Sequence, residues 1–234
     1  MNIDWAEWEP VYESIRADFG YDRAADERAR DRLAQLTIPF DRARGTIPGA
    51  GAVAIAGAGP SLTDDASLER TAAATAVVAA STAADRLREH DIAVDWLVTD
   101  LDKNPETVRR LSEAGTPVAV HAHGDNVDLV ESVVPRCEPG SILPTTQVQP
   151  AGHVVNVGGF TDGDRAAFLA DALGAASLTF VGWDFDDTSV DRTKARKLQW
   201  AERLLYWLER RRGERFSVLD GRRRVIDTSP LPVE

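Results

Sequence analysis

The apolar positions near the N-terminus follow a helical spacing. Between residues 5 and 19, large apolar side chains recur every three or four positions, at Trp5, Trp8, Tyr12, Ile15 and Phe19. This spacing places them on one face of an amphipathic helix. Residues 22–36 carry many charges and are expected to form a second helix, which Pro39 closes. Residues 1–48 are therefore predicted to be an N-terminal helical segment that packs on a larger core.

From Val53 onward, short apolar runs alternate with helical stretches. Six strands are expected, at residues 53–58, 76–80, 96–99, 118–122, 154–157 and 178–182. Six helices are expected between and after them, at residues 67–73, 83–90, 104–114, 127–134, 164–173 and 193–212. This alternation is typical of a mostly parallel sheet flanked by helices, so residues 49–234 are predicted to form a Rossmann-like α/β domain. The tail around Asp220-Gly221 is expected to form a C-terminal β-hairpin.

Composition narrows the classes of protein. The formal net charge of −11 argues against a nucleic-acid binder, because such proteins carry basic patches. The single cysteine, Cys137, excludes a disulfide framework and a cysteine-rich zinc site. The sequence has no run of about 18 apolar residues and no basic-then-apolar leader, so we expect a cytoplasmic protein with no membrane partner.

The choice of charged residues is unusual. The chain has 24 Asp and 14 Glu, but 24 Arg against only three Lys. Acid enrichment with few lysines is typical of proteins that work at high internal salt, where exposed charges are strongly screened. Two of the three lysines, Lys194 and Lys197, open the expected last helix, where positive charge opposes the helix dipole. Bound polyphosphate is the simplest explanation, and a chance surface pair is the alternative.

Candidate chemistry gathers after the predicted strands, where open α/β sheets bind their ligands. After the first strand, Gly57, Gly59, Pro60 and Ser61 form a loop whose backbone amides can approach a phosphate or nucleotide. An ordinary tight turn is the alternative. Leu62 occupies the place of the third small residue of a dinucleotide fingerprint, which argues against a dehydrogenase.

The third and fourth strands end in acids and histidines. Asp100 and Asp102 fall on one side of the chain and offer oxygen ligands for a hard cation such as Mg²⁺. His121 and His123 lack a third nitrogen or sulfur ligand for zinc. His123 is therefore expected to bind a ligand or phosphate, and Asp125 to join the other aspartates. Solvated loop acids and a structural histidine are the alternatives.

The last two predicted strands also lead into candidate residues. Gly159 and Thr161 can form a wall for a flat ring or a phosphate, although a helix cap explains part of that motif. Asp184 stands between Trp183 and Phe185. These two aromatic side chains can stack on a heterocycle or belong to the core.

Five sequence blocks occur in order: Gly57–Leu62, Val98–Asp102, His121–Asn126, Gly159–Arg165 and Lys194–Leu198. Together they resemble the archaeal 6-hydroxymethyl-7,8-dihydropterin pyrophosphokinase family, a relative of the thiamine pyrophosphokinases. The resemblance covers roughly residues 53–208, and the composition suits a member from a halophilic archaeon. One departure is Lys103, which stands where a small residue is expected.

The resemblance implies a transferase that moves a pyrophosphoryl group from ATP to a reduced pterin, with Mg²⁺, in folate or methanopterin synthesis. It implies metal ligands at Asp100, Asp102 and Asp125, charge stabilisation by Lys194 and Lys197, and Asp125 as the candidate base. Nucleotide contacts are expected from Gly57, Gly59, Pro60, Ser61, His123, Gly159, Thr161 and Asp184.

Two other functions stay open at this point. Asp-x-Asp after a strand also serves metal-dependent glycosyltransferases that use a nucleotide-sugar. A non-catalytic nucleotide-binding module is the second alternative, and it would bind a ligand without turnover. The expected partners are small molecules, and a homodimer stays open through Trp5, Trp8 and the C-terminal tail.

Overall fold

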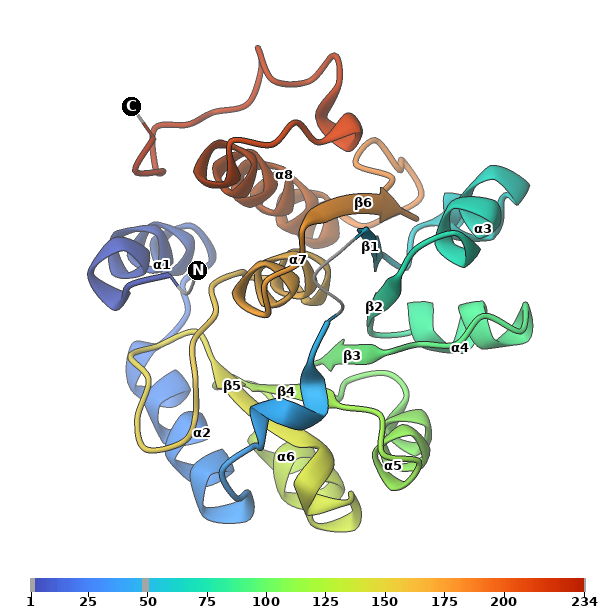
Figure 1. Ribbon diagram of the computed structural model, residues 1–234. Coiled ribbons are helices and arrows are strands. Elements are labelled where there is room, and N and C mark those ends of the chain that lie inside the picture. Colours follow the sequence, from blue (N-terminus) through green and yellow to red (C-terminus); the bar gives the residue numbers. More distant parts are fainter. Residues whose placement is uncertain (1–2, 48–50, 234) are drawn as a thin grey trace.

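A six-stranded parallel sheet forms the centre of the molecule. The computed structural model describes residues 3–47 and 51–233. The strands lie in the order β5-β4-β3-β2-β1-β6, and each neighbouring pair is parallel. They are β1 (Ala52–Ala56), β2 (Ala76–Ala80), β3 (Trp96–Thr99), β4 (Val118–Ala122), β5 (Ile142–Thr146) and β6 (Ser177–Val181). The prediction of a Rossmann-like α/β fold is confirmed (Figure 1).

Helices cover both faces of this sheet. Within the described residues they are α1 (Trp5–Phe19), α2 (Arg23–Leu36), α3 (Asp65–Ala72), α4 (Ala83–Glu89), α5 (Pro105–Glu113), α6 (Val127–Val133), α7 (Asp162–Ala172) and α8 (Arg192–Arg212). Short 3₁₀ turns are η1 (Arg42–Gly45), η2 (Pro60–Thr63), η3 (Val134–Arg136), η4 (Pro139–Ser141) and η5 (Ser217–Leu219). In these ranges no helix is both long and apolar enough to cross a lipid bilayer.

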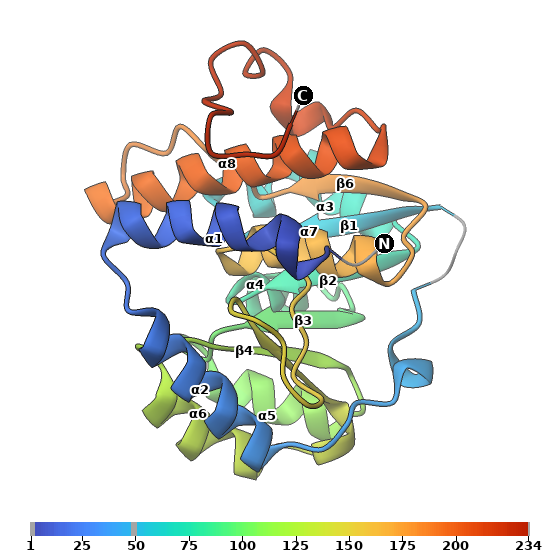
Figure 2. The ribbon, with the colours of Figure 1, turned by 90° about the vertical axis from the view of Figure 1, so that its left-hand side faces the viewer.

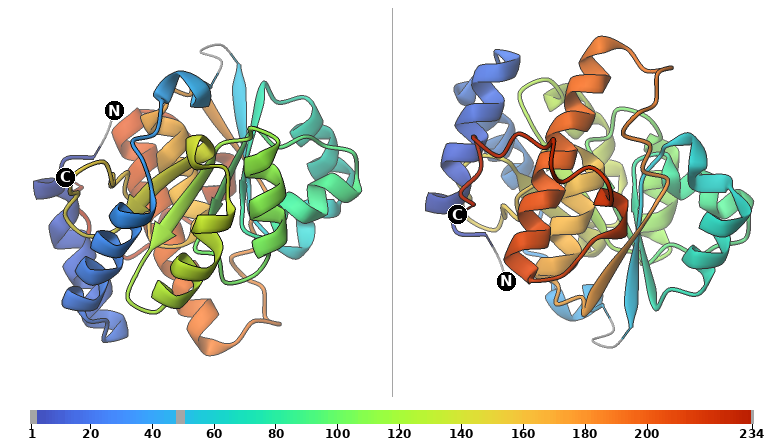
Figure 3. Two further views of the ribbon diagram at one scale, coloured as in Figure 1. Left: turned by 90° about the horizontal axis from the view of Figure 1, so that it is seen from below. Right: turned by 90° about the horizontal axis from the view of Figure 1, so that it is seen from above.

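The direction of the connections decides which face each helix covers. From β1 to β5 the chain moves one way across the sheet, and α3 to α6 lie on one face (Figure 1). The chain then returns to the far side of β1 through α7, which lies on the opposite face beneath α8 (Figure 3). Right-handed crossovers require this change of face when the direction reverses.

The strands read as continuous apolar runs because both faces are buried. In β1, Val53 and Ile55 contribute to the core under α1, α7 and α8. Ala54 and Ala56 face the other way, into the core under α3 to α6. The period of two therefore divides each strand between two hydrophobic cores.

The N-terminal helices are fixed to the rest of the fold. Trp8 of α1 is only 1% exposed and stacks on Trp207 of α8, with ring centroids 6.2 Å apart. Helix α2 lies beside α6 (Figure 2). The expected use of Trp8 as an exposed dimer contact is therefore wrong. The proposed boundary at residues 48 and 49 lies outside the described residues.

The fifth strand is not where the sequence predicts it. Residues 154–157 form only isolated bridges, and the strand itself is β5, Ile142–Thr146. It contains Pro144 and lies at the edge of the sheet, where a residue without an N–H is tolerated. Val155 covers that edge, because its N–H donates to the Pro144 carbonyl at 3.0 Å. Pro144 therefore explains why residues 142–146 were not predicted to form a strand.

The expected C-terminal β-hairpin is wrong. Residues 216–227 contain the 3₁₀ turn η5 and further turns at residues 220–225, but no strand. Side-chain anchors to α8 replace strand pairing here: the Phe216 N–H donates to Glu209 Oε2 at 2.6 Å, and Arg223 forms an ion pair with Glu209 at 2.6 Å. Phe216 and Leu219 are buried in the core beneath the tail.

Candidate active site

A cleft of about 720 Å³ opens at the carboxyl ends of the strands. The loops after β1, β3, β4 and β6 line it, together with the starts of α7 and α8 and the corner between α1 and α2. It includes the gap between β1 and β6, where the direction of the connections reverses. Open α/β sheets bind their ligands at such a position.

Most of the predicted site residues meet in this cleft. Those that line it are Gly57, Gly59, Pro60, Asp100, Asp102, His123, Asp125, Thr161, Asp184, Lys194 and Lys197. Ser61 and Gly159 are not among the lining residues. Gly159 has a φ of +90°, and a Cβ atom there would lie 2.6 Å from the Cα of Arg165. Its role in the fold is to let the chain pass close to Arg165.

Backbone amides of the loop after β1 already donate hydrogen bonds within the protein. The N–H groups of Gly57 and Gly59 donate to carbonyls at and just beyond the end of β6, both at 2.9 Å. Ser61 donates to Asp184 Oδ2 through its N–H at 3.0 Å and its hydroxyl at 2.8 Å. These three amides, which the sequence suggested for phosphate, therefore already have partners. Asp184 in turn fixes the loop.

Asp100 and Asp102 both reach the cleft because the chain turns sharply between them. Leu101 has a φ of +71°, an uncommon conformation for a branched residue that costs strain. Its N–H donates to Thr99 Oγ1 at 2.9 Å, and its side chain is buried. The Asn126 amide holds the turn from the next loop by donating to the Asp100 carbonyl at 2.8 Å.

The carboxyl groups here perturb one another. Burial acts to raise the pKa of Asp100, but the hydrogen bond to His123 and the charge of Arg165 outweigh it and hold that pKa well below its usual range. Burial and the neighbouring Asp100 raise the pKa of Asp102. Burial and the charge of Asp100 also raise the pKa of Asp162 to about 8. Asp162, which the sequence analysis did not single out, is thus a third member of this acidic group.

The oxygen ligands in the cleft suit Mg²⁺, which completes its coordination with water and phosphate. They do not suit a metal whose ligands all come from the protein. Within residues 3–47 and 51–233, no three His, Cys, Asp or Glu side chains are grouped so as to hold a metal. Mg²⁺ is usually bound by one or two carboxylates, waters and substrate phosphates. Asp100 and Asp102 meet that requirement. Asp125 is exposed, and its place among the ligands stays a prediction.

The two histidines have different surroundings. His123 lines the cleft with its Nε2 3.6 Å from Asp100 Oδ2, and its Nδ1 accepts from the Asp125 N–H at 3.3 Å. His121 is only 2% exposed and its Nδ1 lies 3.2 Å from Thr145 Oγ1. Burial holds the pKa of His121 well below its usual range, so this ring is neutral. Only His123 is placed to meet a ligand.

All three lysines of the chain line the cleft. Lys103 Nζ lies 3.3 Å from Asp102 Oδ2. Lys194 and Lys197 form no ion pair with any residue that the structure describes. Both lie in the first turns of α8, whose N-cap Asp191 accepts from the Lys194 N–H at 2.7 Å. In a chain that otherwise uses arginine, this placement suits an anionic ligand, and the binding role of the two lysines stays a prediction.

Known proteins match this chain over most of its length. Residues 31–190 match the family described as 6-hydroxymethylpterin diphosphokinase MptE-like. The chain belongs to this family. It is 37% identical to a protein of Methanothermobacter thermautotrophicus, over 88% of this chain and 94% of the relative. It is 36% identical to one of Pyrococcus furiosus, over 97% and 100%, and 32% identical to one of Methanocaldococcus jannaschii, over 88% and 96%. All three relatives are named 6-hydroxymethyl-7,8-dihydropterin pyrophosphokinase.

Sequence reasoning missed the contribution of the N-terminal helices to the site. Asp26 of α2 lines the cleft yet is only 3% exposed. Its carboxylate accepts from the Tyr12 hydroxyl at 2.8 Å, from Gln147 Nε2 at 2.7 Å and from the Gly124 N–H at 2.7 Å. The sequence pattern could have indicated a buried role for Asp26, because this acid lies at helical spacing from Ala29 and Leu33 on the apolar side of α2.

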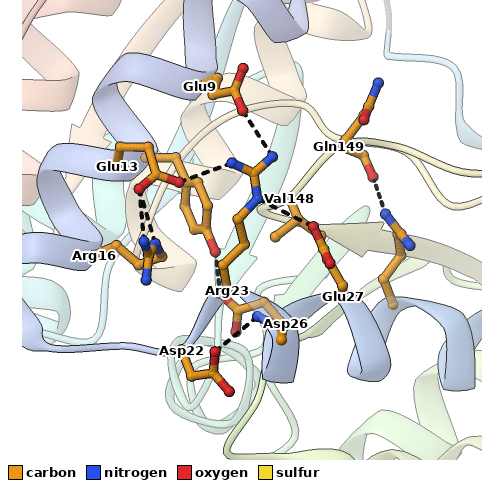
Figure 4. A network of polar contacts seen from close by, with 12 residues as sticks. Glu9, Glu13, Arg16, Asp22, Arg23, Asp26, Glu27, Val148 and Gln149 are labelled. Carbon is orange, nitrogen blue, oxygen red and sulfur yellow. Dashed lines mark hydrogen bonds and ion pairs between the residues drawn. The ribbon is translucent and has the colours of Figure 1, made fainter.

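Charged contacts brace the corner between α1 and α2. Figure 4 shows Arg23 of α2 between Glu9 and Glu13 of α1 and Glu27 of its own helix. The three N–O distances are 2.8, 3.1 and 3.2 Å respectively. The corner that carries Tyr21 into the cleft is therefore tied on both sides.

Proposed function

We propose that the protein transfers a pyrophosphoryl group from ATP to 6-hydroxymethyl-7,8-dihydropterin. The products are the pterin diphosphate and AMP, and Mg²⁺ is required. The names of the three relatives support the choice of pterin substrate. The observation that carries the proposal is the meeting of every lysine of the chain with the Asp100–Asp102 pair in one cleft.

The reaction forms one bond and breaks one. The hydroxymethyl oxygen attacks the β-phosphorus of ATP, the bond from that phosphorus to the α-phosphate oxygen breaks, and AMP leaves. Such a transfer depends mainly on positioning and on stabilising charge at the phosphates. Bound Mg²⁺ would neutralise part of that charge, held by Asp100 and Asp102. Lys194 and Lys197, which have no carboxylate partner among the described residues, stabilise the remainder.

The hydroxyl proton needs an acceptor. Asp125 is our proposal for this role, because it lines the cleft beside His123, on the loop next to the acidic pair. Its exposure leaves it free to pass the proton to water. We place the reaction in the cytoplasm, with the product consumed in folate or methanopterin synthesis.

Formation of AMP tests the proposal. The purified protein is incubated in molar KCl with Mg²⁺, ATP and the reduced pterin, and adenine nucleotides are separated by chromatography. We expect pterin-dependent AMP, reduced at least about 100-fold in Asp100→Asn and Asp102→Asn, because metal-held charge stabilisation contributes several kcal/mol. Asp128→Asn, an exposed acid of α6 outside the cleft, is the matched control and keeps its activity.

The outcomes separate the reaction from the assignment of residues. Absence of pterin-dependent AMP with the unmodified protein would refute the proposed function and turn attention to nucleotide-sugar donors. AMP that persists in both folded aspartate variants would keep the reaction but remove Asp100 and Asp102 as the metal ligands.

A further inference from the structure

The cleft has two halves of different chemistry. We call the part of the lining that contains Lys194 and Lys197, at the start of α8, the lysine half. The corner half is built by Tyr21, Gln147, Phe160 and Arg165, with Asp26 behind Gln147. We propose that the corner half binds the pterin ring, with Gln147 and Arg165 contacting its pyrimidine edge, and that the polyphosphate lies in the lysine half. This assignment rests on the proposed function and adds which residues select the acceptor substrate.

An aromatic wall in the corner half suits a flat ring. Tyr21 and Phe160 line the cleft with ring centroids 6.3 Å apart. Phe19 packs against both, at 5.4 Å from Tyr21 and 5.1 Å from Phe160. Lys197 Nζ lies 5.9 Å from the Phe160 ring centroid, so the phosphate-binding half begins where this wall ends. A bicyclic ring against the wall has its substituent next to the lysines.

Gln147 presents an oxygen whose direction is fixed. Its side chain is buried, and Nε2 donates to Asp26 Oδ2 at 2.7 Å. The Arg165 guanidinium can only donate hydrogen bonds, so the amide oxygen faces Arg165 and the amide nitrogen faces Asp26. That oxygen lies 3.3 Å from Arg165 Nη2, the Gln147 side chain also interacts with the buried His121 ring, and the oxygen can accept a hydrogen bond from a ligand in the cleft. Asp26 is thus a positioning residue that acts through Gln147.

Arg165 is a buried guanidinium with unused donors. Its side chain is 6% exposed, and among the described residues it contacts Asp162 Oδ1 and Gln147 Oε1, both at 3.3 Å. Its Nε is buried and has no partner among the described residues. Arg165 lines the cleft, and each of its two terminal nitrogens makes one contact of 3.3 Å, so N–H groups of these nitrogens remain for a ligand.

The pterin ring matches this pair and adenine does not. In 7,8-dihydropterin the 4-oxo oxygen lies beside N5, as O6 lies beside N7 in guanine, and arginine is the usual bidentate partner of such an edge. Adenine carries an amino group at that place, which would face the Arg165 donors. The pterin N3–H and 2-amino group in turn can donate to Gln147 Oε1. The hydroxymethyl carbon is bonded next to N5, which brings it to the side of Arg165 and Asp100.

Separate Michaelis constants for the two substrates test the assignment. Gln147→Leu and Arg165→Lys are expected to raise KM for the pterin at least about tenfold, the effect of one lost hydrogen bond, and to leave KM for ATP within about twofold. Lys194→Ala is expected to do the reverse. Gln149→Leu makes the same change at an exposed position outside the cleft and should alter neither constant. Asp26→Asn should raise the pterin KM with a smaller change in kcat, as expected for a positioning residue.

A measurement on the unmodified enzyme decides the matter even if a variant fails to fold. A pterin analogue with a 4-amino group in place of the 4-oxo group should bind at least about tenfold more weakly, because it sets donor against donor at Arg165. Equal binding of the analogue, or variants that raise KM for ATP alone, would overturn the assignment. An enzyme that makes no pterin-dependent AMP would instead refute the underlying function.

Discussion

Burial of His121 should make the stability of the protein depend on pH in a way that one substitution removes. The folded protein holds this ring neutral, with its pKa well below the usual range. In the unfolded chain it titrates near its ordinary value of about 6.5. Below that pH the His121 ring binds a proton in the unfolded state but not in the folded state. The contribution to stability is therefore fully present above pH 6.5 and is lost as the pH falls.

The size of the effect follows from the linkage between proton binding and folding. Between pH 7.5 and pH 5.5 the loss amounts to about 1.4 kcal/mol for one histidine. With a urea slope of roughly 2–3 kcal/mol per molar, the unfolding midpoint should fall by about 0.5–0.7 M more in the parent than in His121→Gln. His90→Gln, at the exposed end of α4, is the matched control and should behave like the parent.

Urea unfolding curves at the two pH values check this prediction. The comparison uses the change between pH values within each protein, so any constant cost of fitting glutamine at the buried site cancels. If His121→Gln loses as much stability on acidification as the parent does, the reasoning about this ring is refuted.

Three further predictions concern the cleft and its supports. Gly59→Ala would place a Cβ 2.3 Å from Asp184 Oδ2, so we expect a loss of about 1–3 kcal/mol in urea unfolding together with weaker ATP binding; unchanged values would show that the loop can move aside. Arg23→Ala removes the ion pairs to Glu9, Glu13 and Glu27 and should cost about 1 kcal/mol at low salt and less in molar KCl; an equal loss at both salts would contradict an electrostatic origin. Removal of divalent ions with EDTA should abolish AMP formation and added Mg²⁺ should restore it, whereas full activity in EDTA would exclude a metal role.

Much of the sheet could be predicted because its strands are buried on both faces. The apolar runs at β2, β3 and β4 match the expected ranges residue for residue, and β1 and β6 differ only at their ends. The strand β5 was not predicted, because Pro144 interrupts the apolar pattern that identifies a strand. The strand forms all the same, because a strand at the edge of a sheet tolerates proline. The tail around Asp220 has a turn sequence but pairs with side chains of α8 instead, which a local pattern cannot reveal.

The residues of the candidate site were also predictable only in part. Residues that directly follow a strand could be found, because the strand-end rule needs only local order. The roles of Gln147 and Arg165 could not be found, and Asp26 could be noticed only as an acid on the apolar side of its helix, since their contacts span sequence separations of 121 and 18 residues. The sequence shows Ser61 as a phosphate-loop residue, whereas its bonds to Asp184 are visible only once β1 and β6 lie side by side.

Because every lysine of the protein lies in one cleft, reagents that react with amines can modify side chains there selectively. Apart from the amine at the start of the chain, Lys103, Lys194 and Lys197 are its sole primary amines, since all its other basic side chains are guanidinium or imidazole groups. An acylating or reductively alkylating reagent therefore finds its side-chain targets in the cleft alone. A fluorophore or cross-linker attached through an amine would report on this cavity, and a bound polyphosphate would shield those same sites.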